Sequence, residues 1–491
     1  MKCYLTLYLL LFINYSYAHA QRTFDVKDST TIYGKVVDFN PLRNDKLINF
    51  YVNDILGTEN VQSVQIKNDG SYRFTFFRPF DSDMQIEYNN EIYIIYASSK
   101  EPLQLNISAN LPIPSVQAIG NNATSVLSNL ITTYSVEFYK HDFEIKNILG
   151  NKELTDSSFN KKRIALYQEQ VKFAEQFNAE YSVSDKNFLN WQKNNLIFSL
   201  AEDLAANPFY GRINTRIDFP ELFVELDKLK LNSFTSNVNR NYYKFLRSLE
   251  GAFEIIVNIN PNYESEKLKN GKNPLPVYLG QVDKYLSGVL KQLLYYHLCY
   301  VNSADIDLDN SDFKHIKAIL INDYLINSIT NKIKSIKSNF QSFDVLEKIK
   351  SLKFEDSLKV KILTLFEKYS GNNIYLDFWG DWCGPCMSEM PHYKNLISRL
   401  KPEKIINMFI SAYTKDESVQ DIKKKFAIDG VFYNLSRDEI SILQNVFSFH
   451  SYPKHFLIKD NRVFSEAGGI GGNNIEAISN EIIKKFNSIG K

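Results

Sequence analysis

Two cysteines three residues apart stand where the sequence changes from a strand pattern to a helix pattern. Residues 373–379 (NIYLDFW) are typical of a buried strand, and residues 384–400 have the pattern of a helix. If Cys386 occupies the first turn of that helix, its sulfur lies close enough to that of Cys383 to form a disulfide. Cys383 would then face the free N–H groups and positive end of the helix, which favour a thiolate. A partly exposed thiolate is the species that attacks a disulfide of another protein.

Chain length and charge limit the classes of protein to consider. With 491 residues the chain is long for one domain, so we expect two or three folded units. Its formal net charge is +1, and no block of basic residues stands out. Nucleic acids and anionic membrane surfaces are therefore poor candidate partners.

Residues 1–20 have the pattern of a secretory signal peptide. Lys2 supplies the positive charge, residues 5–13 the apolar core, and residues 18–20 (AHA) a cleavage site of small residues. The apolar run is short for a membrane anchor, although a retained N-terminal anchor is the alternative. We therefore expect a protein secreted across the inner membrane, in the periplasm or cell envelope.

The remaining cysteines do not form a disulfide-stapled scaffold. Cys3 would leave with the signal, so three cysteines remain, and a stapled scaffold needs several even pairs in a short chain. Cys299 lies in an apolar helix pattern at residues 289–301. We expect it to be a buried, inert thiol rather than a third redox partner.

Residues 21–115 are predicted to form a small antiparallel β-sandwich. Short segments in which apolar and polar residues alternate recur through this region, separated by turn residues. Residues 68–70 (NDG) predict a hairpin between two of these segments. The predicted strands cover residues 31–37, 48–52, 64–66, 71–76, 86–88, 92–96 and 103–107.

Residues 120–365 have a different pattern, in which apolar residues recur three or four positions apart, as on one face of a helix. No fixed repeat period is present, so a solenoid is not supported. We predict an all-α middle region whose aromatic residues form its core. The predicted helical stretches are residues 124–146, 164–181, 186–206, 238–257, 280–301, 312–336 and 342–368.

Residues 370–491 alternate between strand and helix patterns. Two strand–helix units are followed by a short helix, a predicted hairpin around residues 459–462 and a terminal helix at residues 473–487. This order of elements is that of a thioredoxin fold. The sequence as a whole thus predicts a multidomain protein: an N-terminal antiparallel β-sandwich, an all-α middle region and a C-terminal α/β thioredoxin fold.

Residues 371–491 resemble the thioredoxin domain of the extracytoplasmic thiol-disulfide oxidoreductases of the TlpA and ResA type. Residues 382–386 (WCGPC) match the family motif in full, and Pro391 matches the proline that bends the active-site helix. Tyr452–Pro453 occupies the place of the family's cis-proline, and residues 412–446 match the extra segment of the TlpA branch. More loosely, the whole chain resembles secreted thioredoxin-like proteins of the Bacteroidetes.

The resemblance implies a role for each residue of the motif. Cys383 is the attacking nucleophile, and Cys386, more buried, resolves the mixed disulfide by attacking Cys383. Gly384 and Pro385 shape the turn into the helix, and in this family a Gly-Pro pair lies on the reducing side. Trp382 covers the disulfide and offers an apolar contact to substrate; the alternative is a packed aromatic.

Two acidic residues are candidates for proton transfer. Asp377, six residues before Cys383, matches the buried acid of thioredoxins. Because burial disfavours an isolated carboxylate, Asp377 could exchange a proton with Cys386 when that thiol attacks. An exposed strand-end Asp is the alternative. Glu389 matches the Glu-x-Pro of the TlpA branch and could relay protons through water, with a solvated helix position equally plausible.

The Tyr452–Pro453 pair is predicted to contact substrate. A cis bond before Pro453 would hold backbone groups beside the sulfurs, where an extended substrate can pair with them. Tyr452 departs from the Thr or Val common in the superfamily, which leaves substrate preference open.

His392, His450 and His455 lie near these motifs in sequence. Without a second ligand pair at metal spacing, we expect surface or packing roles for them and no metal site.

The sequence therefore favours a dithiol-disulfide oxidoreductase that reduces protein disulfides, with the Cys383–Cys386 disulfide as its redox centre and no separate cofactor. Its expected partners are envelope proteins with disulfides, apocytochrome c among the possible ones, and a membrane thiol-reductant donor. One alternative is a disulfide oxidant or isomerase that uses the same residues. Another is an envelope partner-binding protein in which the thioredoxin unit is accessory.

Overall fold

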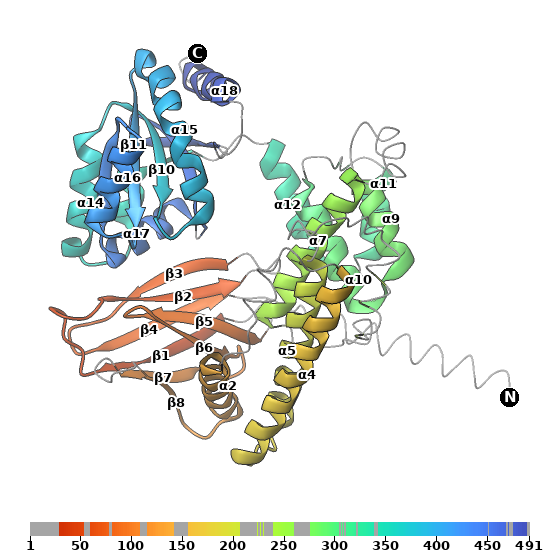
Figure 1. The fold of residues 1–491 in the computed structure, drawn as a ribbon. Helices are drawn as coiled ribbons and strands as arrows, with labels where there is room; N and C mark the ends of the chain where they lie inside the picture. Colours follow the sequence, from red (N-terminus) through yellow and green to blue (C-terminus); the bar gives the residue numbers. More distant parts are fainter. Residues whose placement is uncertain are drawn as a thin grey trace.

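The computed structural model contains the three parts that the sequence predicts, and the multidomain fold class is confirmed (Figure 1). The predicted signal peptide lies outside the described residues. The longer described segments are residues 29–53, 59–77, 81–108, 115–141, 156–206, 239–259, 275–303, 311–320, 323–337, 342–449, 451–467 and 475–488. Between them the structure describes the single positions Phe223, Leu226, Leu229, Ile306, Leu308 and Ile470.

The N-terminal part is a sandwich of two four-stranded sheets. Strand β4 shows the alternation that builds its core, because Tyr72, Phe74 and Phe76 are buried while the residues between them are exposed. One sheet has the order β4-β1-β7-β8, with β4 Ser71–Phe77, β1 Ser29–Val37, β7 Leu103–Ser108 and β8 Ser115–Ile119. The other has the order β3-β2-β5-β6, with β3 Glu59–Gln65, β2 Leu47–Asn53, β5 Ser82–Tyr88 and β6 Glu91–Ala97.

Two details of the predicted sandwich are wrong. The chain does turn tightly at residues 67–70, where Gly70 N donates to Lys67 O at 2.8 Å. The flanking strands β3 and β4 nevertheless belong to different sheets, so the turn joins the two layers and is not a hairpin. In addition, β1 pairs with β7 in parallel, so the sandwich is not purely antiparallel. Turn residues specify a local reversal, but the partner of each strand depends on burial across both layers.

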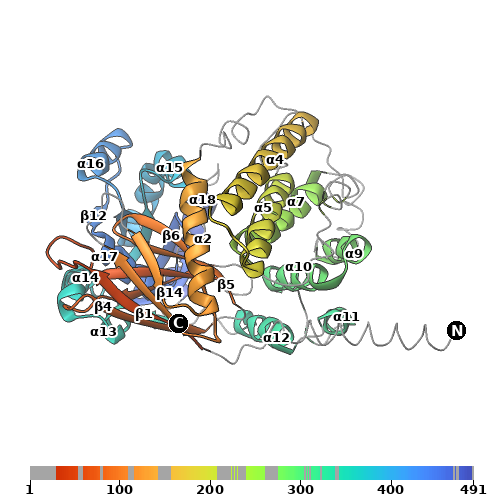
Figure 2. The same ribbon diagram turned by 90° about the horizontal axis from the view of Figure 1, so that it is seen from below.

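Helix α2 (Ala123–Lys140) protects an edge of each sheet. Thr132 Oγ1 donates to Ile94 O of β6 at 2.8 Å. Asn129 Nδ2 donates to Ala118 O of β8 at 2.8 Å, and Asn129 Oδ1 accepts from Ala118 N at 2.7 Å. Side chains of α2 therefore occupy backbone groups that an edge strand would otherwise expose. Figure 2 shows α2 running across this side of the sandwich.

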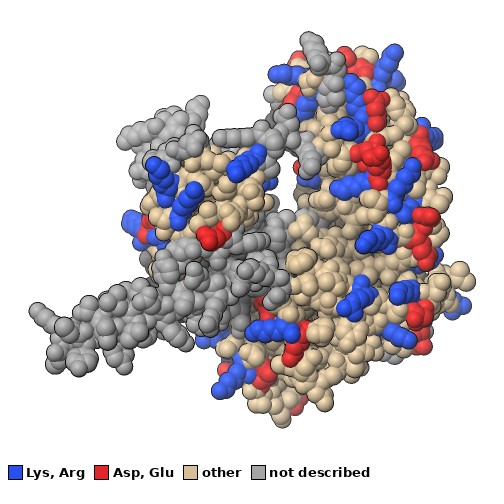
Figure 3. Space-filling model, turned by 180° about the vertical axis from the view of Figure 1, so that it is seen from behind, with Lys and Arg blue, Asp and Glu red and all other residues tan. Residues whose placement is uncertain are grey.

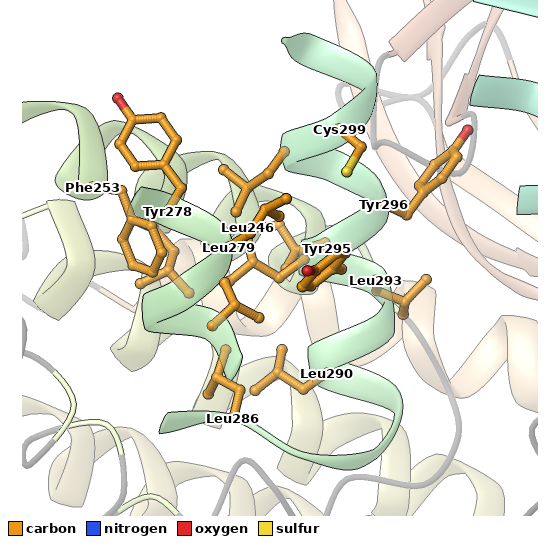
Figure 4. Close-up of a cluster of buried hydrophobic side chains, with 14 of the residues drawn as sticks. Leu246, Phe253, Tyr278, Leu279, Leu286, Leu290, Leu293, Tyr295, Tyr296 and Cys299 are labelled. Atoms are coloured by element: carbon orange, nitrogen blue, oxygen red, sulfur yellow. The ribbon is translucent and has the colours of Figure 1, made fainter. Parts of the chain in front are cut away.

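The middle part is helical, as predicted. Its largest core cluster contains Cys299, whose side chain is fully buried among leucine and tyrosine side chains (Figure 4). Burial raises the pKa of the Cys299 thiol far above its ordinary value, which agrees with the expected inert thiol. The helices are α4 Asp156–Glu180, α5 Lys186–Ala206, α7 Arg240–Ile259, α9 Leu275–Tyr285, α10 Gly288–Val301, α11 Ser311–Ile319 and α12 Asp323–Lys337.

The C-terminal part is a six-stranded sheet with helices on both faces. Its order is β12-β11-β10-β13-β14-β9, in which β10 pairs in parallel with β11 and antiparallel with β13. The strands are β9 Phe343–Asp344, β10 Asn373–Trp379, β11 Ile405–Ala412, β12 Val431–Leu435, β13 Lys454–Lys459 and β14 Arg462–Ala467. The helices are α13 Val345–Ser351, α14 Asp356–Lys368, α15 Gly384–Leu400, α16 Asp416–Lys425, α17 Arg437–Phe447 and α18 Ile475–Ser488, with a 3₁₀ turn at Lys401–Glu403.

The C-terminal unit begins earlier than the predicted boundary at residues 365–370. Strand β9 pairs with β14 at the edge of the sheet. Ile349 of α13 and Ile362 of α14 are fully buried in one cluster with Leu376 of β10. The helical pattern at residues 342–368 was assigned to the middle region because periodicity shows which face is buried, but not against which domain.

Helix α17 packs on the outer face of the β3-β2-β5-β6 sheet (Figure 1).

Figure 3 shows acidic and basic side chains interspersed on the face of the molecule that it draws. Of the helices in the described segments, none is long and apolar enough to cross a membrane.

Candidate active site

Cys383 and Cys386 form a disulfide at the N-terminus of α15. Their Cα atoms are 5.2 Å apart. Cys383 is the N-cap residue, and its Sγ accepts a hydrogen bond from Cys386 N at 3.2 Å. The side chains are 4% and 1% exposed, respectively, so Cys386 is the more deeply buried. The central strand β10 ends four residues before Cys383, which places the pair just beyond the carboxyl end of that strand.

Trp382 forms the exposed surface next to the disulfide. Its side chain is 54% exposed, and its Nε1 donates to Ala412 O at 2.9 Å, which fixes the indole. The indole lies over the backbone of Gly380, where an added Cβ would be only 2.5 Å from Trp382 Nε1. Gly380 is therefore required for this position of the ring. The indole also packs against the rings of Tyr413 and Tyr452, so the contact of Trp382 with substrate stays a prediction beside the alternative of a packed aromatic.

The Tyr452–Pro453 peptide bond is cis, as the resemblance predicts. The Tyr452 ring lies 5.4 Å from the Trp382 ring in a T-shaped arrangement and 5.5 Å from the Phe449 ring. Tyr452 also packs against the apolar cluster that contains both cysteines. The two side chains predicted to contact substrate thus lie side by side next to the disulfide.

The remaining residues of the motif shape helix α15. Pro385 lies in its first turn, where the missing N–H of proline has no helical partner to lose. Pro391 lies inside the helix and removes one internal hydrogen bond, as the predicted bend requires. Gly384 and Pro385 are exposed beside the sulfurs.

Asp377 is buried beneath the cysteine pair, but it is not isolated. It is 1% exposed, so the alternative of a water-exposed strand end is wrong. Tyr393 of α15 donates its hydroxyl to Asp377 Oδ2 at 2.6 Å. On the neighbouring strand β13, His455 Nε2 lies 3.2 Å from Asp377 Oδ1. The free-energy cost of burying this carboxyl group is therefore offset by two polar partners.

Glu389 joins the same cluster from α15. It is 4% exposed, so the alternative of a solvated helix position is wrong. Its Oε1 accepts from Ile470 N at 2.9 Å, and its Oε2 lies 3.2 Å from His455 Nε2. One imidazole thus contacts two buried carboxyl groups.

The pKa values of this cluster follow from burial and charge. Burial alone lowers the pKa of His455, but Asp377 and Glu389 outweigh burial and raise it to about 9. Burial, followed by the nearby carboxylates, raises the pKa of the Tyr393 and Tyr375 hydroxyls far above the ordinary value. His455 is therefore positively charged at neutral pH, and both phenols are neutral.

Sequence reasoning missed the place of His455 in this site. The residue is fully buried against two acids, whereas a surface or packing role was expected. One available signal was its position two residues after Pro453, at the start of the predicted hairpin that follows the cis-proline position. His392 is half-buried on α15, and His450 lies outside the described residues. Within the described segments, no group of three or more His, Cys, Asp or Glu residues is arranged to hold a metal ion.

Comparisons with known proteins agree with this geometry. Residues 371–463 match the sequence profile of a family described as thioredoxin-like. The thiol-disulfide oxidoreductase ResA of Bacillus thuringiensis is 28% identical over 102 residues, which are 21% of this chain and 57% of that protein. ResA of Geobacillus kaustophilus is 28% identical over 93 residues, 19% of this chain and 52% of that protein. The chain thus spans about half the length of these relatives.

A solved structure, the thioredoxin domain of a thiol-disulfide oxidoreductase from Bacteroides vulgatus, is 13% identical and covers 26% of this chain and 84% of its own, with a TM-score of 0.22. A likeness at that score carries no argument about this chain.

The sequence matches and the order of strands and helices support one assignment. The C-terminal part of this chain is a thioredoxin-like domain, and it resembles the ResA/TlpA-type thiol-disulfide oxidoreductases.

Proposed function

We propose that this protein is an extracytoplasmic thiol-disulfide oxidoreductase that reduces disulfides of other proteins. The observation that carries the proposal is the Cys383–Cys386 disulfide at the N-terminus of α15. The backbone N–H groups and positive end of that helix stabilise a thiolate on Cys383 after reduction. The exposed indole of Trp382 and the ring of Tyr452 provide an aromatic surface beside it for a substrate chain.

The reaction proceeds through a mixed disulfide. The Cys383 thiolate attacks one sulfur of the substrate disulfide, and the other substrate sulfur leaves and takes up a proton. Cys386 then loses its proton and attacks Cys383 Sγ, which releases the second substrate sulfur. Two electrons pass from the dithiol to the substrate, and the protein is left in its disulfide form. The disulfide itself is the redox centre, so the reaction needs no separate cofactor and no metal.

The predicted signal at residues 1–20 supports a location in the periplasm or cell envelope. In such an oxidising compartment the disulfide must be reduced again, so we propose a membrane thiol-reductant as electron donor. Substrates are envelope proteins with disulfides, apocytochrome c among them. Nucleic acids are not proposed as partners, because the net charge is close to neutral.

Reduction of insulin by the purified protein with dithiothreitol tests the activity. We expect the wild-type protein to accelerate insulin precipitation and Cys383→Ser to abolish the acceleration. Cys299→Ser is the matched control, because this thiol is fully buried in the helical region and should leave the rate unchanged. Equal rates for wild type and Cys383→Ser would reject the proposal.

Trapping in cells tests the partners. Cys386→Ala lacks the resolving thiol, so mixed disulfides through Cys383 should accumulate and identify the substrates. A Cys383→Ser/Cys386→Ala control should trap nothing. If Cys386→Ala traps no protein although Cys383 is reactive, or if Cys383→Ser retains full cellular function, the alternative of a partner-binding protein with an accessory thioredoxin unit is favoured.

A further inference from the structure

A histidine lies between two buried carboxyl groups beneath the redox pair. We propose that His455 is a positioning residue for the resolving step: its ring gives Asp377 a partner and a counter-charge beneath the redox pair, so that Asp377 can accept the proton of the Cys386 thiol. This inference rests on the proposed function and assigns to it a residue outside the cysteine motif. Its basis is the geometry of three elements, namely β10, β13 and α15.

The strand register brings Asp377 and His455 together. They are direct partners in the antiparallel pair of β10 and β13, so their side chains emerge on the same face of the sheet. The Nε2 atom of His455 is 3.2 Å from both Asp377 Oδ1 and Glu389 Oε2. The ring also stacks on Tyr375, with 5.6 Å between centroids, which fixes the plane of the imidazole.

Helix α15 connects this cluster to the resolving cysteine. Cys386, Glu389 and Tyr393 fall at positions i, i+3 and i+7, so they share one helix face. That face points at the sheet, since all three residues are buried and the Tyr393 hydroxyl lies 2.6 Å from Asp377 Oδ2. Asp377 therefore faces the side of α15 that also carries Cys386.

The balance of charge makes the imidazole necessary. Two carboxyl groups that both contact one imidazole and are removed from water repel each other unless a counter-charge lies between them. His455 is the one cationic side chain that ion pairs place beside them within the described segments. The other titratable groups that face it are the neutral phenols of Tyr375 and Tyr393.

The other elements that pack against β13 add no charge to the cluster. Strand β14 places Ala467 opposite His455. Helix α18 contributes Ile482 and Phe486 to the adjacent apolar core. Glu466 of β14 forms an ion pair with Lys454, the residue before His455 on β13, whose side chain lies on the other face of that strand.

The step in which His455 acts is the attack of Cys386. The proton of the Cys386 thiol passes to the Asp377 carboxylate, and the Cys386 thiolate forms a bond with Cys383 Sγ. The bond between Cys383 and the substrate sulfur breaks, the substrate sulfur takes the electron pair, and it is protonated from water. If His455 is replaced by a neutral side chain, the two buried acids lose their counter-charge, and Asp377 becomes a poorer base for the Cys386 thiol.

Stopped-flow oxidation of the reduced protein by a nitrobenzoate disulfide separates the two steps. Attack by Cys383 releases one coloured thiolate, and resolution by Cys386 releases the second. For His455→Gln we expect an unchanged first phase and a second phase slowed about tenfold at neutral pH, with its pH midpoint about one unit higher. The matched control is His392→Gln, a half-buried histidine on α15, which should leave both phases as in wild type.

Removing the competing acid should rescue the variant. In His455→Gln/Glu389→Gln only one carboxyl group remains, so we expect the second phase to return toward the wild-type rate and pH midpoint. An unchanged second phase in His455→Gln, or an equal loss in both phases without rescue, would overturn the inference. If the wild-type protein shows no first phase, the proposed function itself fails, which is a different result.

A second measurement needs no substitution. Nitrogen NMR shifts of the His455 ring in the wild-type protein report its charge directly. We expect a doubly protonated ring at neutral pH. A neutral ring at that pH would contradict the role proposed here, whatever the kinetics of the variants.

Discussion

His455 connects the charge of the active site with the stability of the domain. Its ring lies between Asp377 and Glu389, and these acids raise its pKa from 6.5 to about 9 despite burial. The folded protein therefore binds this proton more tightly than the unfolded chain does. The resulting stabilisation is complete below about pH 6.5 and is lost as the pH rises through about 9.

This shift predicts a pH-dependent effect of His455→Gln on unfolding. A pKa difference of this size corresponds to about 3 kcal/mol. The loss of unfolding free energy relative to wild type should be largest near about pH 6 and smallest near about pH 10. Urea unfolding of both oxidised proteins measures it, with His392→Gln as the control for loss of a histidine. A loss of the same size at both pH values would contradict the ion-pair description.

At the residue scale, the sequence predicted the motif better than its surroundings. The cysteine pair, Asp377 and the cis peptide at Pro453 were predictable, because each occupies a fixed position relative to a strong local pattern. The contacts of Glu389 and His455 were not, since they depend on the register of β13 against β10 and on the rotation of α15.

At the scale of elements, helix α17 joins the thioredoxin-like unit to the sandwich through a polar stripe. Arg437, Ser441 and Asn445 fall at i, i+4 and i+8 on one face of the helix. They contact Glu87, Asn49 and Ser63, which are register partners across three neighbouring strands. The match of helix and sheet spacing orients the two units with hydrogen bonds, beside an apolar contact in which Leu47 of β2 is buried in the same cluster as residues of α17.

The Arg437–Glu87 contact is the ion pair of this stripe. Its side chains are 21% and 10% exposed, so Arg437→Met leaves Glu87 with little water and no cation. We expect a loss of about 2 kcal/mol or more in unfolding free energy, partly recovered in Arg437→Met/Glu87→Gln. Lys401→Met is the control, because its pair with Asp429 is 74% and 81% exposed and should contribute under about 1 kcal/mol. Equal losses in denaturant titrations would contradict a stabilising role for the stripe.

Most individual elements were predictable and some of their partners were not. Strand β10 and helix α15 agree with the sequence-based ranges at both ends, because strong apolar patterns bound them. The sequence predicted the turn at residues 68–70, but it did not show that this turn connects two different sheets. No pattern within β1 or β7 predicted that these strands pair in parallel. Pairing between distant segments depends on the complete core, which periodicity within one segment does not describe.

At the scale of the molecule, the C-terminal unit should be able to fold separately if it keeps β9, α13 and α14. Most of the contacts described between α17 and the sandwich are polar, and Leu47 of β2 is the sandwich residue in the apolar cluster of the unit, so separation exposes a limited apolar surface. By contrast, cutting at residue 370 removes Ile349, Ile362 and Phe366 from the core around β10. Each is at most 1% exposed, and uncovering such side chains costs about 2 kcal/mol apiece.

A comparison of two fragments tests this boundary. We expect residues 342–491 to unfold cooperatively on heating and to reduce insulin. Residues 370–491 should show a lower melting temperature or no cooperative transition by circular dichroism. Equal melting temperatures for both fragments would mean that β9, α13 and α14 do not contribute to the core of the unit.

The reduction potential of the Cys383–Cys386 couple tests the direction of electron flow that we propose. It is measured by equilibrating the full-length protein with defined thiol–disulfide buffers and determining the fraction of free Cys383 and Cys386. A reductase with a Gly-Pro pair between its cysteines should have a potential near that of thioredoxin, about −270 mV. A potential near about −120 mV, as in strong disulfide oxidants, would contradict the account and assign the same residues to disulfide formation.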